Sequence, residues 1–249
     1  MHKLLLVFLL GLFVYAQDSI EKESLQPTQK EEFLNDFENE YKQQTPVKDP
    51  LIRYNRLMHN INWGIYDYVI SPTLDAYNYA MPLGFRLGIY NFFDNLASPL
   101  RFLASLLAGE PKVAMDELGR FALNSTAGIL GIFDIASQNG LYSHHNDFGI
   151  TLGKWGMGSE FHLVLPLLGP SNFRDTLTLP LNALAYPTNY IQPSELAIGA
   201  GVLEVANYSA RHKATLDSLY QDSLDSYLLF RDSYEQRRNE LILENKGNK

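Results

Sequence analysis

The chain has 249 residues, 46% of them hydrophobic, and a formal net charge of −8. This size allows one or two domains with a sizeable core, while the acidic balance and the lack of a Lys/Arg-rich stretch argue against nucleic acid as a partner. The chain contains no cysteine, which excludes disulfides, a thiolate nucleophile, a cysteine zinc site and a lipidated cysteine.

The N-terminal residues carry the pattern of a secretory signal. Lys3 precedes an almost unbroken apolar stretch over residues 4–15, and Val14-Tyr15-Ala16 places small residues at the two positions that define cleavage. We therefore predict a signal peptide over residues 1–16, cleaved before Gln17. An uncleaved anchor is the alternative, but the stretch is shorter than the about 20 residues that cross a bilayer.

The segment after the signal is polar and acidic. Residues 17–48 contain eight Asp/Glu and four Lys, which indicates a solvated linker. Phe33, Phe37 and Tyr41 recur at four-residue spacing within it, and they would line one side of a short helix if one forms. We expect residues 49–243 to form one helical domain and residues 244–249 to form a polar tail.

The first predicted helix of the domain opens at Asp49-Pro50, because aspartate is a good cap and proline suits the first turn. Its apolar residues form one stripe at spacings of three and four, and Ser71-Pro72 ends it. The stripe comprises Leu51, Tyr54, Met58, Ile61, Ile65 and Tyr68. Asn55, Asn60 and Asn62 lie between the stripe residues; since asparagine is a poor helix-interior residue, we expect packing or hydrogen-bonding roles for them.

Shorter elements fill the rest of the domain. Helices are predicted to begin at Pro82, Ser98-Pro99, Pro111, Ser194 and Asp225, with the fourth extending beyond Lys213 and the last reaching Leu243. Residues 124–131 indicate a break, residues 149–158 an irregular connection, and residues 161–165 the only plausible strand. The predicted class is mainly α, in one irregular domain of short helices broken by proline and glycine.

Residues 163–175 read LVLPLLGPSNFRD and fit no regular element. Large aliphatic side chains fill this run, yet Pro166 and Pro170 disfavour both a helix interior and a central strand. A buried core and a surface that faces lipid are both compatible with it. At its end, Arg174 and Asp175 are predicted to form a structural ion pair.

The sequence carries no motif that indicates catalysis. It has no G-x-S-x-G elbow and no H-E-x-x-H zinc motif, and residues 149–154 are one residue short of a phosphate loop. His144 and His145 are adjacent, so their side chains diverge, which favours a solvated loop over a metal site. We expect a protein that is not an enzyme and has neither cofactor nor metal.

Two questions remain open at the level of composition. Arg101, Arg120 and Arg174 each stand beside apolar residues, so they either pair with carboxylates or meet lipid phosphates. The broken apolar helices either pack into a soluble core or lie in one membrane leaflet, with Tyr and Trp near the headgroups.

A series of short motifs runs in order from about residue 49 to residue 240. They are Asp49-Pro50, Tyr54-Asn55-Arg56 and Asn62; Asn91-Phe92-Phe93-Asp94-Asn95-Leu96 with Pro99; Gly119-Arg120-Phe121 with Asn124-Ser125-Thr126-Ala127-Gly128; Gly131-Ile132-Phe133-Asp134-Ile135-Ala136; Asp147-Phe148-Gly149-Ile150-Thr151-Leu152-Gly153 with Trp155-Gly156; Leu165-Pro166-Leu167-Leu168-Gly169-Pro170-Ser171 with Arg174-Asp175; and Asp225-Ser226-Tyr227, Arg231, Tyr234 and Gln236-Arg237-Arg238. In this order they resemble the MlaA/VacJ family of outer-membrane lipoproteins, which move phospholipids in Gram-negative bacteria.

The resemblance implies a helical ring in the inner leaflet of the outer membrane, with a central amphipathic channel for phospholipid mislocalised to the outer leaflet. It also implies a trimeric porin as partner and delivery of lipid to a soluble periplasmic carrier, MlaC, without any bond made or broken. Candidates for the lipid path are polar residues on largely apolar elements, each with the alternative role of satisfying backbone groups. They are Asn55, Asn60, Asn62, Arg120 and Asn124.

One feature departs from the family, whose members are normally anchored by a lipidated cysteine. Because this chain has no cysteine, we expect ordinary signal-peptidase cleavage, and retention on the periplasmic side of the outer membrane by an apolar belt and by partners. The alternative function is that of a soluble periplasmic lipid-binding or adaptor protein. A lipid hydrolase is a third reading, which the missing motifs disfavour.

Overall fold

The computed structural model describes residues 46–244. The predicted signal peptide, nearly all of the predicted linker and all but one residue of the predicted tail therefore lie outside the described residues. The elements follow in this order: α3 (Ile52–Ile65), the π-helix η1 (Tyr66–Ile70), α4 (Ser71–Ala80), α5 (Leu83–Leu107), α6 (Pro111–Thr126), α7 (Ile135–Gln138), α8 (Phe148–Lys154), β1 (His162–Leu165), β2 (Gly169–Asn172), α9 (Phe173–Ala185), the 3-10 helix η2 (Pro187–Tyr190), α10 (Ser194–Asp222) and α11 (Ser226–Leu243).

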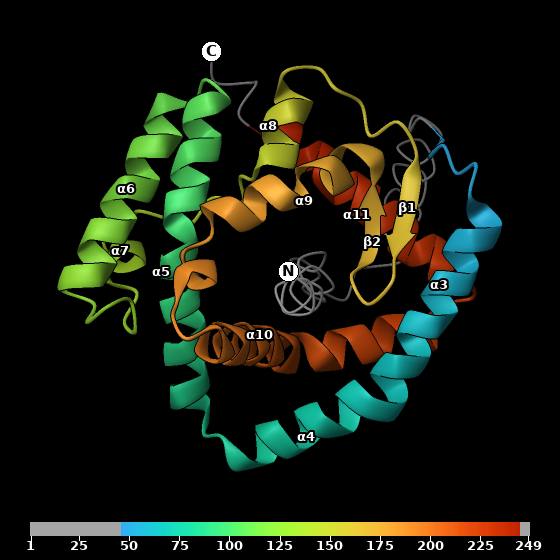
Figure 1. Cartoon of the computed structure of the whole chain (residues 1–249), viewed down its shortest axis with the longest axis horizontal. Helices are drawn as coiled ribbons and strands as arrows, with labels where there is room; N and C mark the ends of the chain where they lie inside the picture. Colours follow the sequence, from blue (N-terminus) through green and yellow to red (C-terminus); the bar gives the residue numbers. More distant parts are fainter. Residues whose placement is uncertain (1–45, 245–249) are drawn as a thin grey trace, which may run out of the picture.

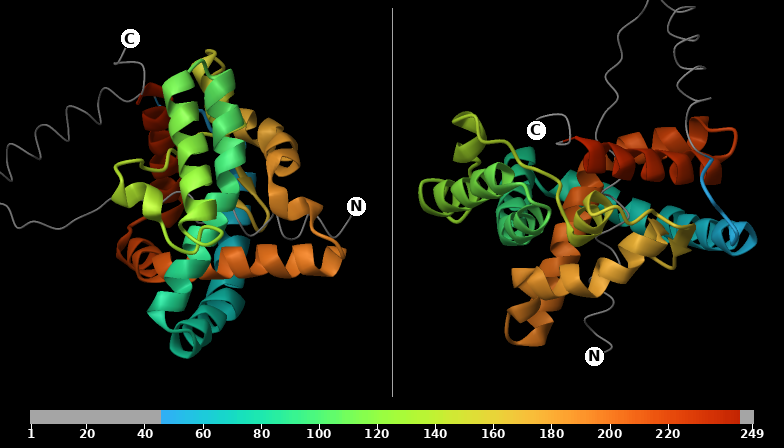
Figure 2. Two further views of the ribbon diagram at one scale, coloured as in Figure 1. Left: turned by 90° about the vertical axis from the view of Figure 1, so that its left-hand side faces the viewer. Right: turned by 90° about the horizontal axis from the view of Figure 1, so that it is seen from above.

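These elements are arranged as a ring (Figure 1). One arc consists of α3, η1 and α4, and α5 runs along the opposite side with α6 packed on its outer face. The β1–β2 hairpin and α9 close the circle, while α10 crosses the ring and contacts both α4 and α5. Figure 2 shows α11 on one face of the ring and α9 on the other. The expected class, mainly α with the elements in a ring, is confirmed.

Helix α3 presents its apolar stripe outward. Leu51 and Ile61 are 41% and 43% exposed, whereas Asn55, His59 and Asn62 on the opposite face are buried. A helix in a water-soluble domain turns its apolar face toward the core. The polarity of α3 is therefore inverted relative to such a helix.

The asparagines of α3 bind the main chain of the hairpin, which explains their place inside a helix. Asn55 donates to the carbonyl of His162 (3.1 Å) and accepts from the amide of Val164 (2.8 Å). Asn62, two turns later on the same face, donates to the carbonyl of Leu165 (2.8 Å) and accepts from the amide of Leu167 (2.7 Å). Each side-chain amide therefore imitates a neighbouring strand and satisfies backbone groups at the outer edge of β1.

The run at residues 163–175 forms most of this hairpin and the start of α9. Only one strand was expected here, but β2 pairs antiparallel with β1 and places Pro170 opposite Val164. Proline is tolerated because β2 is an edge strand in a two-stranded sheet. The turn between the strands is tight, with positive φ angles at Leu167 (64°) and Gly169 (79°).

Several predicted helix ends were wrong. The first helix begins after Leu51 without a side-chain cap and continues past Ser71-Pro72 through η1 into α4. The wider π turn lies just before Pro72 and leaves room for its ring. The two helices predicted around Pro99 are one helix, α5, because a proline costs one backbone hydrogen bond and the packing of α6 along α5 offsets that loss. Ser194 also makes no side-chain cap for α10.

Helix α8 lies where an irregular connection was expected. Asp147 begins it by accepting a hydrogen bond from the amide of Ile150 (2.7 Å). A Cβ on Gly149 would lie 2.3 Å from Asp175 Oδ1, and one on Gly153 would lie 2.3 Å from Ile242 Cδ1. The glycines therefore serve the close approach of α8 to its neighbours rather than a loop.

Polar side chains occupy much of the interior, and apolar side chains much of the periphery. The buried apolar residues form small clusters, one around Tyr66, Leu74 and Leu216 and another around Ile150 and Leu241. Large apolar side chains on other elements are exposed; their exposed fractions include those of Phe85 (68%), Met115 (60%), Leu130 (65%), Leu177 (52%), Leu181 (50%) and Leu184 (65%). Across residues 46–244, no helix combines the length and apolarity needed to cross a membrane.

Candidate functional site

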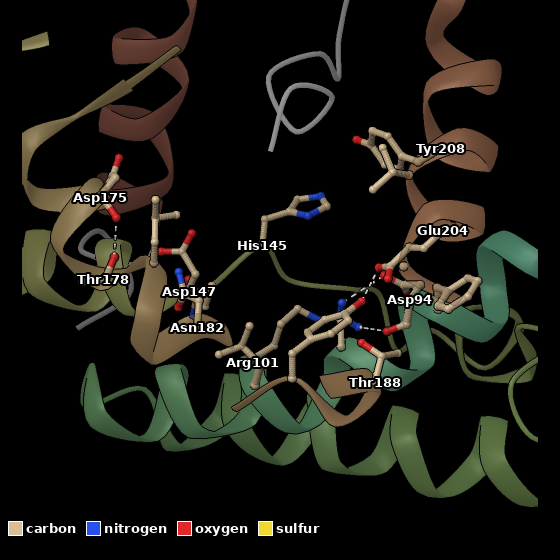
Figure 3. Close-up of a pocket in the computed structure, with 18 of the residues that line it drawn as sticks. Asp94, Arg101, His145, Asp147, Asp175, Thr178, Asn182, Thr188, Glu204 and Tyr208 are labelled. Carbon is tan, nitrogen blue, oxygen red and sulfur yellow. Dashed lines mark hydrogen bonds and ion pairs between the residues drawn. The ribbon is translucent and has the colours of Figure 1, made fainter. Parts of the chain in front are cut away.

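A cavity of about 240 Å³ lies at the centre of the ring. Its walls come from α5, the loop before α8, β2, α9, η2, α10 and α11, so it forms only when segments far apart in the sequence come together. Its polar lining includes Asp94, Arg101, His145, Asp147, Asp175, Thr178, Asn182, Thr188, Glu204 and Tyr208. Figure 3 shows Glu204 and Tyr208 on one side of this space, Asp175 and Thr178 on the other, and His145 directed into it between them. Apolar residues such as Phe93, Leu100, Leu179 and Val205 complete the lining, so the cavity is amphipathic.

One charge network holds the α5–α6 side of the cavity. Arg101 donates to Asp94 (3.0 Å) and to Glu117 (2.8 Å), and Arg120 lies 3.2 Å from Asp94. Burial would raise the pKa of Glu117, but the hydrogen bond from His144 and the positive charge of Arg101 outweigh it and lower that pKa to about 2. The carboxylate therefore stays ionised and fixes both helices.

A second network joins α8, α9 and α11. Arg238 donates to Asp147 (2.8 Å) and to Asp175 (2.8 Å), and Tyr234 donates to Asp175 (2.8 Å). Arg174 Nε lies 2.9 Å from Asp175 Oδ1, so the residues of the predicted pair are in contact. Burial would raise the pKa of Asp175, but the charges of Arg238 and Arg174 hold it well below its usual range.

The five candidates for the lipid path lie outside the central cavity. Asn55 and Asn62 bind the hairpin, and Asn60 is exposed on the outside of α3. Arg120 is buried and bonded to the carbonyl of Leu141 and to aspartates, and Asn124 bonds Asp134 (3.0 Å) and the amide of Ala136 (2.9 Å). None of the five lines the central cavity; Asn62 contributes to a second, apolar cavity of about 200 Å³ between α3, η1, α4 and α10.

The polar residues of the cavity were missed because they come from separate elements. Asp94 belongs to one of the quoted motifs, and Glu204 is an acid within an otherwise largely apolar stretch of α10. The motif that contains Asp94 and the isolated acid Glu204 were the sequence features that indicated these cavity residues. His144, expected in a solvated loop, instead contacts the buried Glu117 through its amide (2.6 Å). Among residues 46–244, no group of His, Cys, Asp and Glu has a metal-binding arrangement.

The three arginines in question all make structural pairs. Arg101, Arg120 and Arg174 have side chains that are 2–3% exposed, and each lies within 3.5 Å of at least one carboxylate oxygen. These pairs hold the polar interior rigid, and the exposed apolar residues lie around it. The fold and site thus define a class: a mainly α, ring-shaped protein with an apolar periphery and an amphipathic central cavity.

Comparison with known proteins identifies the family. A family model described as MlaA lipoprotein matches residues 47–241. The chain is 32% identical over 193 residues to the intermembrane phospholipid transport system lipoprotein MlaA of Shigella flexneri, and 31% identical over 193 residues to the protein of that name from Escherichia coli (strain K12), covering 76% of each chain in both cases. A solved structure described as "Structural basis for maintenance of bacterial outer membrane lipid asymmetry" is 30% identical with a TM-score of 0.70, over 78% of this chain and 99% of that one. The chain therefore belongs to the MlaA lipoprotein family.

Proposed function

We propose that this protein transports phospholipid at the outer membrane without catalysis. It removes phospholipid mislocalised to the outer leaflet and passes it to a soluble periplasmic carrier. This removal maintains the lipid asymmetry of the outer membrane. The polarity of the ring is the observation that carries this proposal: apolar side chains lie outside, and an amphipathic cavity bordered by buried charge networks lies inside. The relatives described as phospholipid transport proteins support it.

The periphery supplies a belt that fits a single leaflet. We define the belt as the outward apolar residues of α3, of its N-cap Leu51 and of α9, which include Leu51, Ile61, Leu177, Leu181 and Leu184. Helices keep their backbone groups bonded internally, so they can lie in lipid without unsatisfied donors. Each buried methylene contributes roughly 0.8 kcal/mol, so a belt of several leucines holds the protein on the membrane without an acyl anchor.

The amphipathic cavity supplies a path for the lipid inside that belt. A phospholipid headgroup carries a phosphate and needs polar surroundings, whereas its acyl chains do not. The arginine networks fix the walls, since each arginine in them is paired with a carboxylate and cannot rotate away without loss. Headgroups therefore pass between fixed walls, and no covalent bond is made or broken.

The partners and location in this proposal extend the likeness to the family. We assign the protein to the periplasmic side of the outer membrane, beside a trimeric porin, with an MlaC-like carrier as acceptor. Outer-membrane residence is supported by the description of the similar solved structure and by the apolar belt.

Deletion of the gene tests transport directly. Surface phospholipid is measured with a membrane-impermeant amine reagent on intact cells, in the deletion strain and in the strain complemented with the full chain. Transport predicts a rise in labelled phospholipid that complementation reverses. No rise would count against transport.

Fractionation separates membrane residence from the soluble-carrier alternative. The full chain is expected in the outer-membrane fraction, and the double variant Leu177→Glu/Leu181→Glu should move to the soluble fraction because the two charges lie on one exposed face of α9. Glu195→Gln, an exposed change on α10, is the control and should stay with the membrane. A wild-type chain found wholly in the soluble fraction would favour the soluble carrier.

A further inference from the structure

The carboxylates of the central cavity are not equivalent. Asp94 is matched by Arg101 and Arg120, and Asp147 and Asp175 share Arg238. In each case the nitrogen–oxygen distance is 3.2 Å or less. These three acids therefore have their countercharges within the protein.

Glu204 is the exception. Within residues 46–244, its carboxylate has no Lys, Arg or His nitrogen within ion-pair distance, and its one hydrogen-bond partner is the hydroxyl of Tyr186. It extends from α10 into the cavity, where Tyr208 stands one turn further along the same helix (Figure 3). Burial, with the negative charge of Asp94 adding to it, raises the pKa of Glu204 to about 7 despite the hydrogen bond from Tyr186. A cation brought beside this carboxylate would stabilise its ionised form.

We infer that Glu204 binds the ammonium group of a phospholipid headgroup, and that the cavity therefore selects amine-bearing lipids of the phosphatidylethanolamine class. This inference rests on the proposed function and names its substrate class. The ring of Tyr208 adds a cation–π surface on the same side as the carboxylate.

An anionic headgroup without an amine has no cation to pair with the carboxylate of Glu204. The phosphatidylglycerol headgroup carries a net negative charge and no cation, so it leaves Glu204 uncompensated. Its diol can accept or donate hydrogen bonds but cannot neutralise the carboxylate. Glu204 thus favours the zwitterionic lipid over the anionic one, and a neutral glutamine at this position removes that preference.

The test measures binding of water-soluble, short-chain lipids to the purified full chain in detergent, by titration calorimetry. Three lipids with identical acyl chains are compared: phosphatidylethanolamine, its N-acetylated form, and phosphatidylglycerol. One charge-assisted hydrogen bond predicts that the first binds about tenfold more tightly than the other two. Glu204→Gln should lower phosphatidylethanolamine affinity by about tenfold and leave phosphatidylglycerol affinity unchanged or higher. Glu195→Gln, on the same helix but outside the cavity, should behave as wild type.

The possible results distinguish failure of amine selection by Glu204 from failure of the proposed phospholipid transport. Equal wild-type affinities for phosphatidylethanolamine and its N-acetylated form overturn amine selection, and they do so even where Glu204→Gln fails to fold. A folded Glu204→Gln variant that keeps the wild-type preference overturns the role of this residue. In both cases lipid binding, and with it the proposed function, stands. A folded wild-type chain that binds none of the three lipids overturns the proposed function itself.

Discussion

Replacing Asn62 with leucine tests what this side chain does. Asn62 makes two hydrogen bonds to the hairpin, at 2.8 Å to the carbonyl of Leu165 and 2.7 Å to the amide of Leu167. Leucine has a similar volume but leaves both backbone groups without that partner, at a cost of about 1–3 kcal/mol each. Both backbone groups belong to half-buried residues that water reaches in part, so the lower half of this range applies, giving about 2–4 kcal/mol in total.

Thermal unfolding of the purified full chain, followed by circular dichroism in detergent, measures this loss. For a chain of this size, 1 kcal/mol corresponds to roughly 2–4 °C, so Tm should fall by about 4–16 °C. Asn60→Leu is the matched control, because Asn60 lies on the exposed side of the same helix, and its effect should stay within about 0.5 kcal/mol. An unchanged Tm for Asn62→Leu together with impaired phospholipid transport would refute the structural role and assign Asn62 to the lipid path.

Three further outcomes follow from the packing and charge networks. Arg238→Met removes the shared partner of the buried Asp175 and the half-buried Asp147 and should cost about 3–5 kcal/mol in urea unfolding, whereas Arg237→Met, on the partly exposed side of α11, should cost less than about 1 kcal/mol. Gly149→Ala should destabilise by about 1–3 kcal/mol because its Cβ overlaps Asp175, while Gly84→Ala, with open space around it, should be neutral or stabilising in the same assay. Glu117 contributes stability that is complete above its ordinary pKa of 4.5 and is lost as pH falls toward its folded value of about 2, so Glu117→Gln should flatten acid unfolding across that window; an unchanged acid limb would contradict the depressed pKa.

Local sequence signals predicted several elements correctly. Asp225 caps α11, which ends at Leu243 as expected, and the predicted strand at residues 161–165 is β1. Pro111 begins α6, and α10 extends beyond Lys213. These features depend on capping and periodicity within one segment, which sequence displays directly.

Other features could not be read from the sequence, because they depend on the surroundings of each segment. Periodicity showed that α3 has two faces, but it does not say whether water, protein or lipid covers the apolar one. The asparagines of α3 meet a hairpin more than a hundred residues away, and that distance hid their role. The cavity assembles Asp94, His145, Asn182 and Glu204 from four separate segments, so no local motif predicted it.

In the proposed transport, phospholipid occupies the cavity and does not merely surround the ring. A photoreactive phenylalanine analogue is placed in living cells at Tyr208 or Asn182 in the cavity, at Leu181 in the belt, and at Glu240 on an exposed part of α11. After illumination, covalent phospholipid adducts on the full chain are identified by mass spectrometry. Phospholipid in the cavity predicts adducts at both cavity positions and at the belt position, and none at Glu240. Adducts at Leu181 without any at Tyr208 or Asn182 would contradict it, because lipid would then contact only the outside of the ring.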